Sequence, residues 1–176
     1  MSKRPPKEVS ENIRDQLWQR ADLMSWARLS DSDRSQLYEQ WTNEKGIGGV
    51  LSGFIDPRAV RVYIKDTLMK PYIRHWLDTM EPQVLEKFGL QKASAIASYI
   101  KPHGRQFTGN VVVCWGNSRD WKDVLMSTFE RKNPLGKEGR AHVALVESGH
   151  TLEPASRKLV EDGANRLGIE APVWLV

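Results

Sequence analysis

The chain has 176 residues, 40% of them hydrophobic, which suits one domain or one domain with a small helical addition and argues against global disorder. Lysine and arginine number 26 against 22 acidic residues, so the protein is mildly basic, and an anionic partner is allowed but not required. The N-terminal segment lacks the apolar stretch of a signal peptide, and no apolar run approaches the ~18 residues of a membrane span. The only cysteine, Cys114, leaves no intramolecular disulfide. We therefore expect a cytoplasmic protein with no membrane partner.

Residues 1–95 have the pattern of a helical region. An apolar residue recurs near every fourth position from Val9 to Met24, which predicts an amphipathic helix. Ser30 is a favourable N-cap for a second helix, and the acidic residues that follow it in the first turn suit the helix dipole.

Four glycines between residues 46 and 53 predict a flexible helix–helix connection. The pair Asp56-Pro57 then supplies an N-cap and a first helical residue for the next helix. Pro71 should kink or end that helix. Further short helices are expected up to Gly89, which is a natural stop.

Residues 96–176 show the pattern of an α/β region. Continuous apolar runs predict three buried strands, over residues 111–115, 141–147 and 172–176. Helical periodicity separates them, and the order β-α-β-α-β predicts parallel strands. Residues 95–100 fit either the end of a helix or an edge strand, and residues 101–109 are expected to form a loop. The expected fold is thus α/β, with a helical N-terminal half packed as one unit on a small, mostly parallel β-α-β-α-β sheet.

Polar side chains follow the first two of these strands, where each strand ends. Ligands of open parallel sheets bind beyond the carboxyl ends of the strands. General acid–base chemistry there would use Asp120, Glu147 and His150. A phosphate or nucleotide would be held by residues with polar side chains close to helix N-termini: Asn117, Ser118, Arg119 and Ser148. The alternative is that Ser118 and Thr151 only cap helices, and both interpretations stay open.

Cations are concentrated in one predicted helix, over residues 58–74. They are Arg58, Arg61, Lys65, Lys70 and Arg74, and Arg105 lies in a further basic stretch. The spacing of Arg58, Arg61 and Lys65 places these three on one helical face. Such a row can follow a phosphate backbone, or it can be the solvated side of an amphipathic helix.

Other chemistry is weakly supported by the sequence. The four histidines are scattered, so no metal site is expected, and no cofactor is indicated. Two functions remain. One is a nucleic-acid-associated, for example DNA-binding, protein that uses the basic helix to hold nucleic acid or another polyanion. The other is a small α/β enzyme or nucleotide-binding module, hydrolase- or nuclease-like, with its site at residues 116–120 and 147–151. The tryptophan content also allows a protein partner.

Overall fold

The structure is a computed structural model that describes residues 4–149 and 151–176. Its contacts divide the chain into two compact units, one up to Trp76 and one from Leu77 to Val176. The boundary falls within helix α5 (Tyr72–Thr79).

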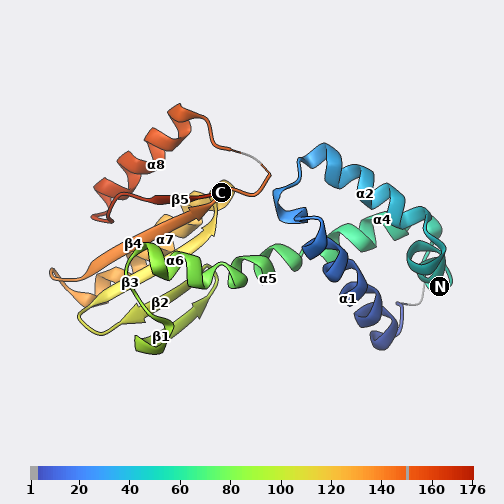
Figure 1. Cartoon of the computed structure of the whole chain (residues 1–176), viewed down its shortest axis with the longest axis horizontal. Coiled ribbons are helices and arrows are strands. Elements are labelled where there is room, and N and C mark those ends of the chain that lie inside the picture. Colours follow the sequence, from blue (N-terminus) through green and yellow to red (C-terminus); the bar gives the residue numbers. More distant parts are fainter. Residues whose placement is uncertain (1–3, 150) are drawn as a thin grey trace. The chain divides into compact units, whose positions relative to one another are not determined.

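The first unit is helical throughout (Figure 1). Besides the start of α5 it contains α1 (Lys7–Leu23), α2 (Asp31–Asn43), α3 (Val50–Ser52), α4 (Val60–Tyr63), π-helical segments at Lys45–Gly49 and Ile64–Met69, and 3₁₀ turns at Trp26–Arg28 and Pro57–Ala59. The predicted caps are confirmed. The Ser30 hydroxyl accepts a bond of 3.1 Å from the Asp33 N–H, and the Asp56 carboxylate accepts one of 2.8 Å from the Arg58 N–H.

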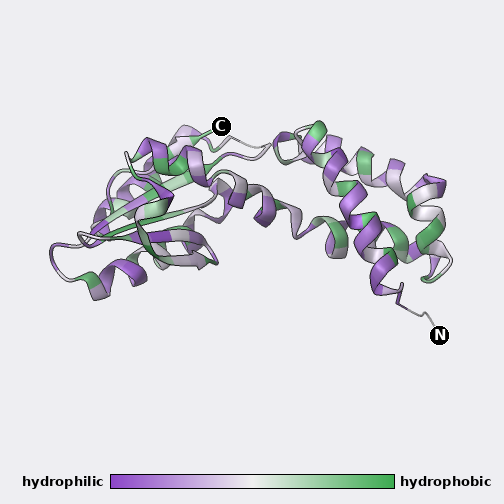
Figure 2. Ribbon diagram, turned by 60° about the horizontal axis from the view of Figure 1, so that its bottom comes forward, coloured by the Kyte–Doolittle hydropathy of each residue, from purple (hydrophilic) through white to green (hydrophobic). Residues whose placement is uncertain are grey.

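The core of this helical unit combines aliphatic residues with a connected group of aromatic rings. The Trp26 ring makes edge-to-face contacts with Tyr38 and Tyr72, at centroid separations of 6.0 and 5.5 Å, and Tyr38 contacts Trp41 at 5.9 Å. Each such pair adds about 1 kcal/mol to the burial of its apolar area. Burial also raises the pKa of Tyr38 to about 12. Hydrophilic and hydrophobic residues alternate along the ribbons of these helices (Figure 2).

The glycine-rich run is helical, so the prediction of a flexible connection is wrong. Residues 45–49 form a π-helical segment that continues directly into α3. The reason lies at Gly48, where a Cβ atom would fall 1.8 Å from the carbonyl oxygen of Thr42. Glycine here permits a close approach of two backbones and does not serve flexibility.

The second unit contains a five-stranded sheet with the order β1-β2-β3-β4-β5 (Figure 1). Its strands are β1 (Ala95–Ile100), β2 (His103–Phe107), β3 (Val111–Asn117), β4 (Arg140–Val146) and β5 (Val173–Leu175). Its helices are the end of α5, α6 (Glu81–Lys87), α7 (Trp121–Lys132) and α8 (Pro154–Arg166), with 3₁₀ turns at Lys92–Ser94, Ser118–Asp120 and Asn133–Leu135.

The sheet is mixed, which corrects the expectation of a mostly parallel one. The three late strands, β3, β4 and β5, are parallel as predicted. However, β1, β2 and β3 form an antiparallel meander, and the segment expected to be a loop supplies the whole of β2. Residues 95–100 form the edge strand β1, one of the two alternatives that the sequence left open.

Helices cover both faces of the sheet, with α6 in front and α7 behind in the view of Figure 1. On the α7 face, Cys114 of β3 packs in one buried cluster with Leu125 of α7 and Val160 of α8. On the other face, the indole N–H of Trp115 donates to the Leu77 carbonyl at 2.8 Å. The side chains of successive β3 residues therefore point to opposite faces of the sheet, as the pleat requires.

Candidate functional site

The loops after β3 and β4 meet at the edge of the sheet, as the parallel strand order predicts. Asn117 pairs with Val146 in the ladder, and its side-chain amide donates to the Ser148 hydroxyl at 2.5 Å. The Asn117 side chain also caps the following turn, by accepting from the Arg119 N–H at 3.0 Å. Asn117 therefore takes the capping role that the sequence assigned to Ser118.

Glu147, a predicted acid–base residue, is held in structural contacts. Its side chain is only 3% exposed, and the carboxylate accepts bonds from Arg157 at 2.6 Å and from the Leu152 N–H at 3.2 Å. The Arg157 guanidinium lies 4.7 Å from the centre of the Trp174 ring, so Glu147 ties the β4 loop to α8 and β5. Both bonds go to the same carboxylate oxygen, Oε1, and the charge of Glu147 is balanced by the guanidinium of Arg157.

The remaining predicted residues at this edge do not converge on one point. Arg119 and Asp120 are exposed, whereas Ser118 is fully buried and its hydroxyl has no hydrogen-bond partner. Although the Asp120 residue is exposed, partial desolvation of its carboxylate, and then the nearby charge of Asp123, raises its pKa, and the charge of Arg119 opposes this shift. His150 lies outside the described residues.

The order of the strands gives a physical reason for doubting an active site at this edge. Ligands of open α/β sheets bind where the strand order reverses, because adjacent loops then separate and leave a crevice. Here the crossovers run from β3 to β4 and on to β5 in one direction, so no reversal lies between them. The Asn117–Ser148 bond closes the space between the two loops.

The basic segment of the helical unit has a different geometry from the one that the sequence predicts. It begins as a 3₁₀ turn at Pro57–Ala59, continues as α4, and becomes π-helical over Ile64–Met69 before α5. The π-helical turn is shown directly by the bond of 2.9 Å from the Lys70 N–H to the Lys65 carbonyl, five residues earlier. Pro71 follows at once, and its missing N–H and bulky ring are incompatible with a regular α-helix at this point.

This wider turn changes which cations share a face. In a regular α-helix, residues five apart point in clearly different directions, because the repeat is 3.6 residues. In a π-helical turn the backbone N–H of one residue bonds to the carbonyl five residues earlier. The side chain of Lys70 therefore projects towards the face that carries Lys65. Arg74 then follows Lys70 at a helical spacing of four. The three residues Lys65, Lys70 and Arg74, all exposed, form what we call the cation row.

Arg58 and Arg61, which precede this row in the chain, differ in how firmly their side chains are held. The Arg58 side chain is 94% exposed and its Nε lies 3.6 Å from a carboxylate oxygen of Asp56. Arg61 is more constrained, because its guanidinium donates to the Ser35 hydroxyl at 2.8 Å and lies 3.5 Å from Glu39. Arg61 therefore bridges α4 to α2, and Arg58 extends further into solvent.

Arg105, the other predicted nucleic-acid contact, is an interior residue of the second unit. Its side chain is 9% exposed, and its Nε lies 2.7 Å from a carboxylate oxygen of Glu81. The guanidinium also lies 5.4 Å from the centre of the Trp115 ring. These contacts stabilise β2 and α6, and they place Arg105 away from any surface that a polyanion could touch.

Sequence reasoning missed an aromatic group beside the cation row. The Trp18 ring stacks on His75 with centroids 4.9 Å apart, and the Arg14 guanidinium lies 5.3 Å from the Trp18 centroid. The Trp18 indole N–H donates to the Leu68 carbonyl at 3.0 Å, which joins α1 to the π-helical turn. The available signal was the four-residue spacing of Arg14 and Trp18 on one helix, which by itself does not separate a surface group from the core.

A cavity of about 200 Å³ adjoins this group, between α1 and the π-helical turn. Lys7 and Arg14 of α1 are among its lining residues, as are Tyr63 and Pro71 from the other side. The Tyr63 hydroxyl is hydrogen-bonded to Ser10 at 3.0 Å. The cavity thus combines two cations with hydroxyl groups and an aromatic wall, and it also contains one acid, Glu11, whose carboxylate lies 3.7 Å from the Lys7 ammonium.

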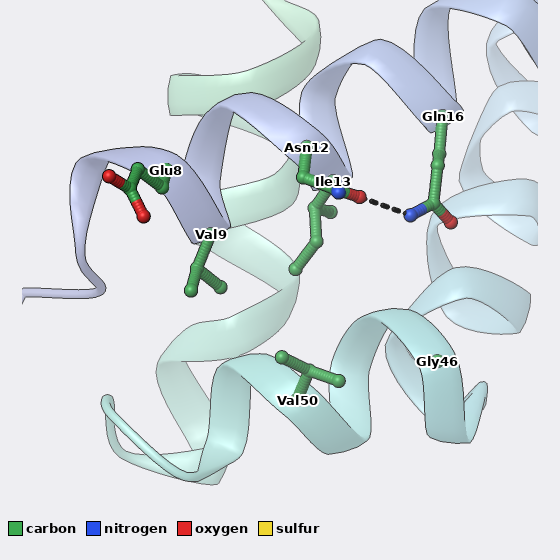
Figure 3. Close-up of a pocket in the computed structure, with 7 residues that line it drawn as sticks. All are labelled: Glu8, Val9, Asn12, Ile13, Gln16, Gly46 and Val50. Carbon is green, nitrogen blue, oxygen red and sulfur yellow. Dashed lines mark hydrogen bonds between the residues drawn. The ribbon is translucent and has the colours of Figure 1, made fainter.

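A groove elsewhere in this unit differs from the cavity in the charge of its lining. It measures about 360 Å³ and lies between α1 and the glycine-rich helical turn, lined by Glu8, Val9, Asn12, Ile13, Gln16, Gly46 and Val50 (Figure 3). The Gln16 amide donates to Asn12 at 2.5 Å within it. Because Glu8 is the charged residue of this lining, the groove does not suit an anion.

Among the described residues, no three His, Cys, Asp or Glu side chains are grouped so that they could hold a metal ion. Within the same part of the chain, no helix has both the length and the apolar character needed to cross a membrane. Comparisons with protein-family models, curated proteins and solved structures gave no match.

Proposed function

We propose that the helical unit binds single-stranded nucleic acid through the cation row and the aromatic group beside it. The observation that carries this proposal is the π-helical turn, which brings Lys70 towards the face of Lys65 and continues it to Arg74. Cations at successive helical turns, about 6 Å apart along the axis, suit a chain of phosphates. π-Helical turns occur often at functional sites.

The aromatic group favours the binding of a single strand over the binding of a duplex. His75 is exposed and stacks on the half-buried Trp18, so its outer ring face is a platform for an unpaired base. His75 directly follows Arg74 in α5, and side chains of consecutive helical residues project about 100° apart, so a backbone contact and a stacking contact would lie on neighbouring sides of this helix. Bases inside a duplex have no face open for such stacking.

The test is fluorescence anisotropy of the full chain with a labelled single-stranded oligonucleotide and with its duplex. Three phosphate contacts to a single strand, one for each residue of the cation row, should make binding about 20-fold weaker at about 200 mM salt than at about 50 mM. Replacing Lys65, Lys70 and Arg74 by Ala should lower the slope of log K against log salt by about 2. His75→Ala should weaken single-strand binding while the salt slope stays close to that of the unchanged chain, because it removes a stacking ring and leaves Lys65, Lys70 and Arg74 in place.

A matched control removes the same charge elsewhere. Lys137, Lys158 and Arg166 are exposed residues of the second unit, and their triple Ala variant should bind as the unchanged chain does. Equal losses for the two triple variants would mean that only net charge matters, and would overturn the assignment of the surface. Failure of the unchanged chain to bind at low salt would overturn the function itself.

A further inference from the structure

Strand β1 is an exposed edge of the sheet with an unusual composition. It is a terminal strand of the sheet, and within the described residues its ladder partner is β2 alone. The strand contains no charged residue and no proline, although natural edge strands are commonly protected by both. Ile96 and Ile100 are 60% and 67% exposed, on the same side of the strand as exposed Ser98.

The opposite side of β1 is fixed to its own unit. The Tyr99 ring lies 4.2 Å from the Arg131 guanidinium of α7, and its hydroxyl donates to Gln106 of β2 at 3.0 Å. A bulge at Ile96 offsets the register to β2, and the pairing is regular from Ala97 to Ile100. The strand is therefore held in an extended conformation with its apolar side open to solvent.

We propose that β1 pairs in antiparallel fashion with β1 of a second copy of this chain, centred on Ser98. The reason is that the sequence of the strand complements itself. In this register Ile96 lies opposite Ile100 of the partner subunit, and Ser98 lies opposite Ser98 of the partner subunit. On the other side of the strand, Ala97 lies opposite the larger Tyr99, so a small residue meets a large one.

Other registers lose this complementarity. A shift of two residues sets each isoleucine against a serine or beyond the paired segment, and a shift of one turns the isoleucines to the other face of the sheet. The centred register also gives a closed contact with twofold symmetry, in which β1 of each copy pairs with β1 of the other and neither β1 is left to bind a further copy. Both sheets then join into one, and the two exposed isoleucines of each chain are covered. This dimer does not depend on the nucleic-acid proposal.

Cysteine cross-linking of the full chain tests the register. Cys114 is buried, so Ser98→Cys introduces the reactive thiol of the protein. Directly opposed residues have Cα atoms about 4.5–5.5 Å apart, within the range of a disulfide. We expect Ser98→Cys to form a covalent dimer under mild oxidation, and Ile96→Cys to form one only together with Ile100→Cys. Ser32→Cys, at an exposed site on α2, controls for random collision.

Light scattering during size-exclusion chromatography tests the contact itself. The unchanged chain should show twice the mass of one chain, and Ile96→Lys with Ile100→Lys should show the single mass, because like charges then face each other twice. Ile96→Lys with Ile100→Glu should restore the double mass through two Lys–Glu pairs. Leu159→Lys, at an exposed apolar site on α8, should leave the mass unchanged. A chain that is monomeric at all concentrations, or a dimer that survives the double Lys change, would overturn the proposal.

Discussion

Gly48 offers a sharp test of how the helical unit is packed. An added Cβ atom would lie 1.8 Å from the carbonyl oxygen of Thr42, 2.5 Å from its carbonyl carbon and 2.9 Å from its Cα. These are backbone atoms in the last turn of α2, which cannot rotate away as the end of a side chain can. We therefore expect Gly48→Ala to push α2 and the glycine-rich turn apart.

The size of the effect follows from two opposing contributions. Overpacking a core costs about 1–3 kcal/mol, and the upper end applies here because backbone has to move. Replacing a helical glycine by alanine raises the free energy of unfolding by about 1 kcal/mol. The expected net loss for Gly48→Ala is therefore about 2 kcal/mol in the free energy of unfolding.

Gly49→Ala in the same turn is the matched control. Its Cβ atom would meet nothing nearer than 3.8 Å, so the helical preference of alanine should stabilise this variant by up to about 1 kcal/mol. Urea unfolding followed by circular dichroism should place the two midpoints more than about 1 M apart, in opposite directions from the unchanged chain. If Gly48→Ala proved as stable as Gly49→Ala, the close approach of the two backbones would be refuted.

Two further predictions concern charged and titrating groups inside the α/β unit. Arg105→Met should lower the free energy of unfolding by about 2 kcal/mol, because buried Glu81 then keeps only the exposed Lys92 as an ion-pair partner, and adding Glu81→Leu should recover most of the loss in the same urea assay. Burial lowers the pKa of His142, although Glu170 opposes this shift and Arg140 adds to it. The unfolded chain therefore binds the proton more readily, so this stability is complete above pH ~6.5 and is lost as the pH falls. His142→Asn should show a smaller fall in unfolding midpoint between about pH 8 and about pH 5, and an equal fall would contradict this reasoning.

The elements that the sequence predicted correctly have local causes. Strands β3, β4 and β5 consist largely of apolar residues, and the starts of α2 and of the basic segment carry side chains that cap them directly. Gly89 and Gly168 end helices with φ angles of +66° and +65°, which glycine adopts without strain. Each of these signals is complete within a few residues of the chain.

Strand β2 could not be predicted in this way, because its neighbours create it. It contains His103, Gly104 and Arg105, none of which favours a strand by itself. A Cβ atom at Gly104 would lie 2.9 Å from the Val113 carbonyl oxygen and 2.8 Å from an Arg131 nitrogen, so glycine allows the guanidinium to lie against the sheet. Arg105 looks like a surface cation in the sequence, and only the fold reveals its buried partner Glu81.

The cation row also could not be predicted from helical periodicity in the sequence, and the reason bears on the proposed function. In a helix with 3.6 residues per turn, Lys65 and Lys70 would project in different directions. The π-helical turn brings them back towards one face. Within that turn the Leu68 carbonyl accepts the Trp18 indole N–H, and Pro71 excludes the regular alternative. The contact that anchors α1 therefore also determines which cations share a face. If binding uses this face, core packing and affinity are coupled through one hydrogen bond from Trp18.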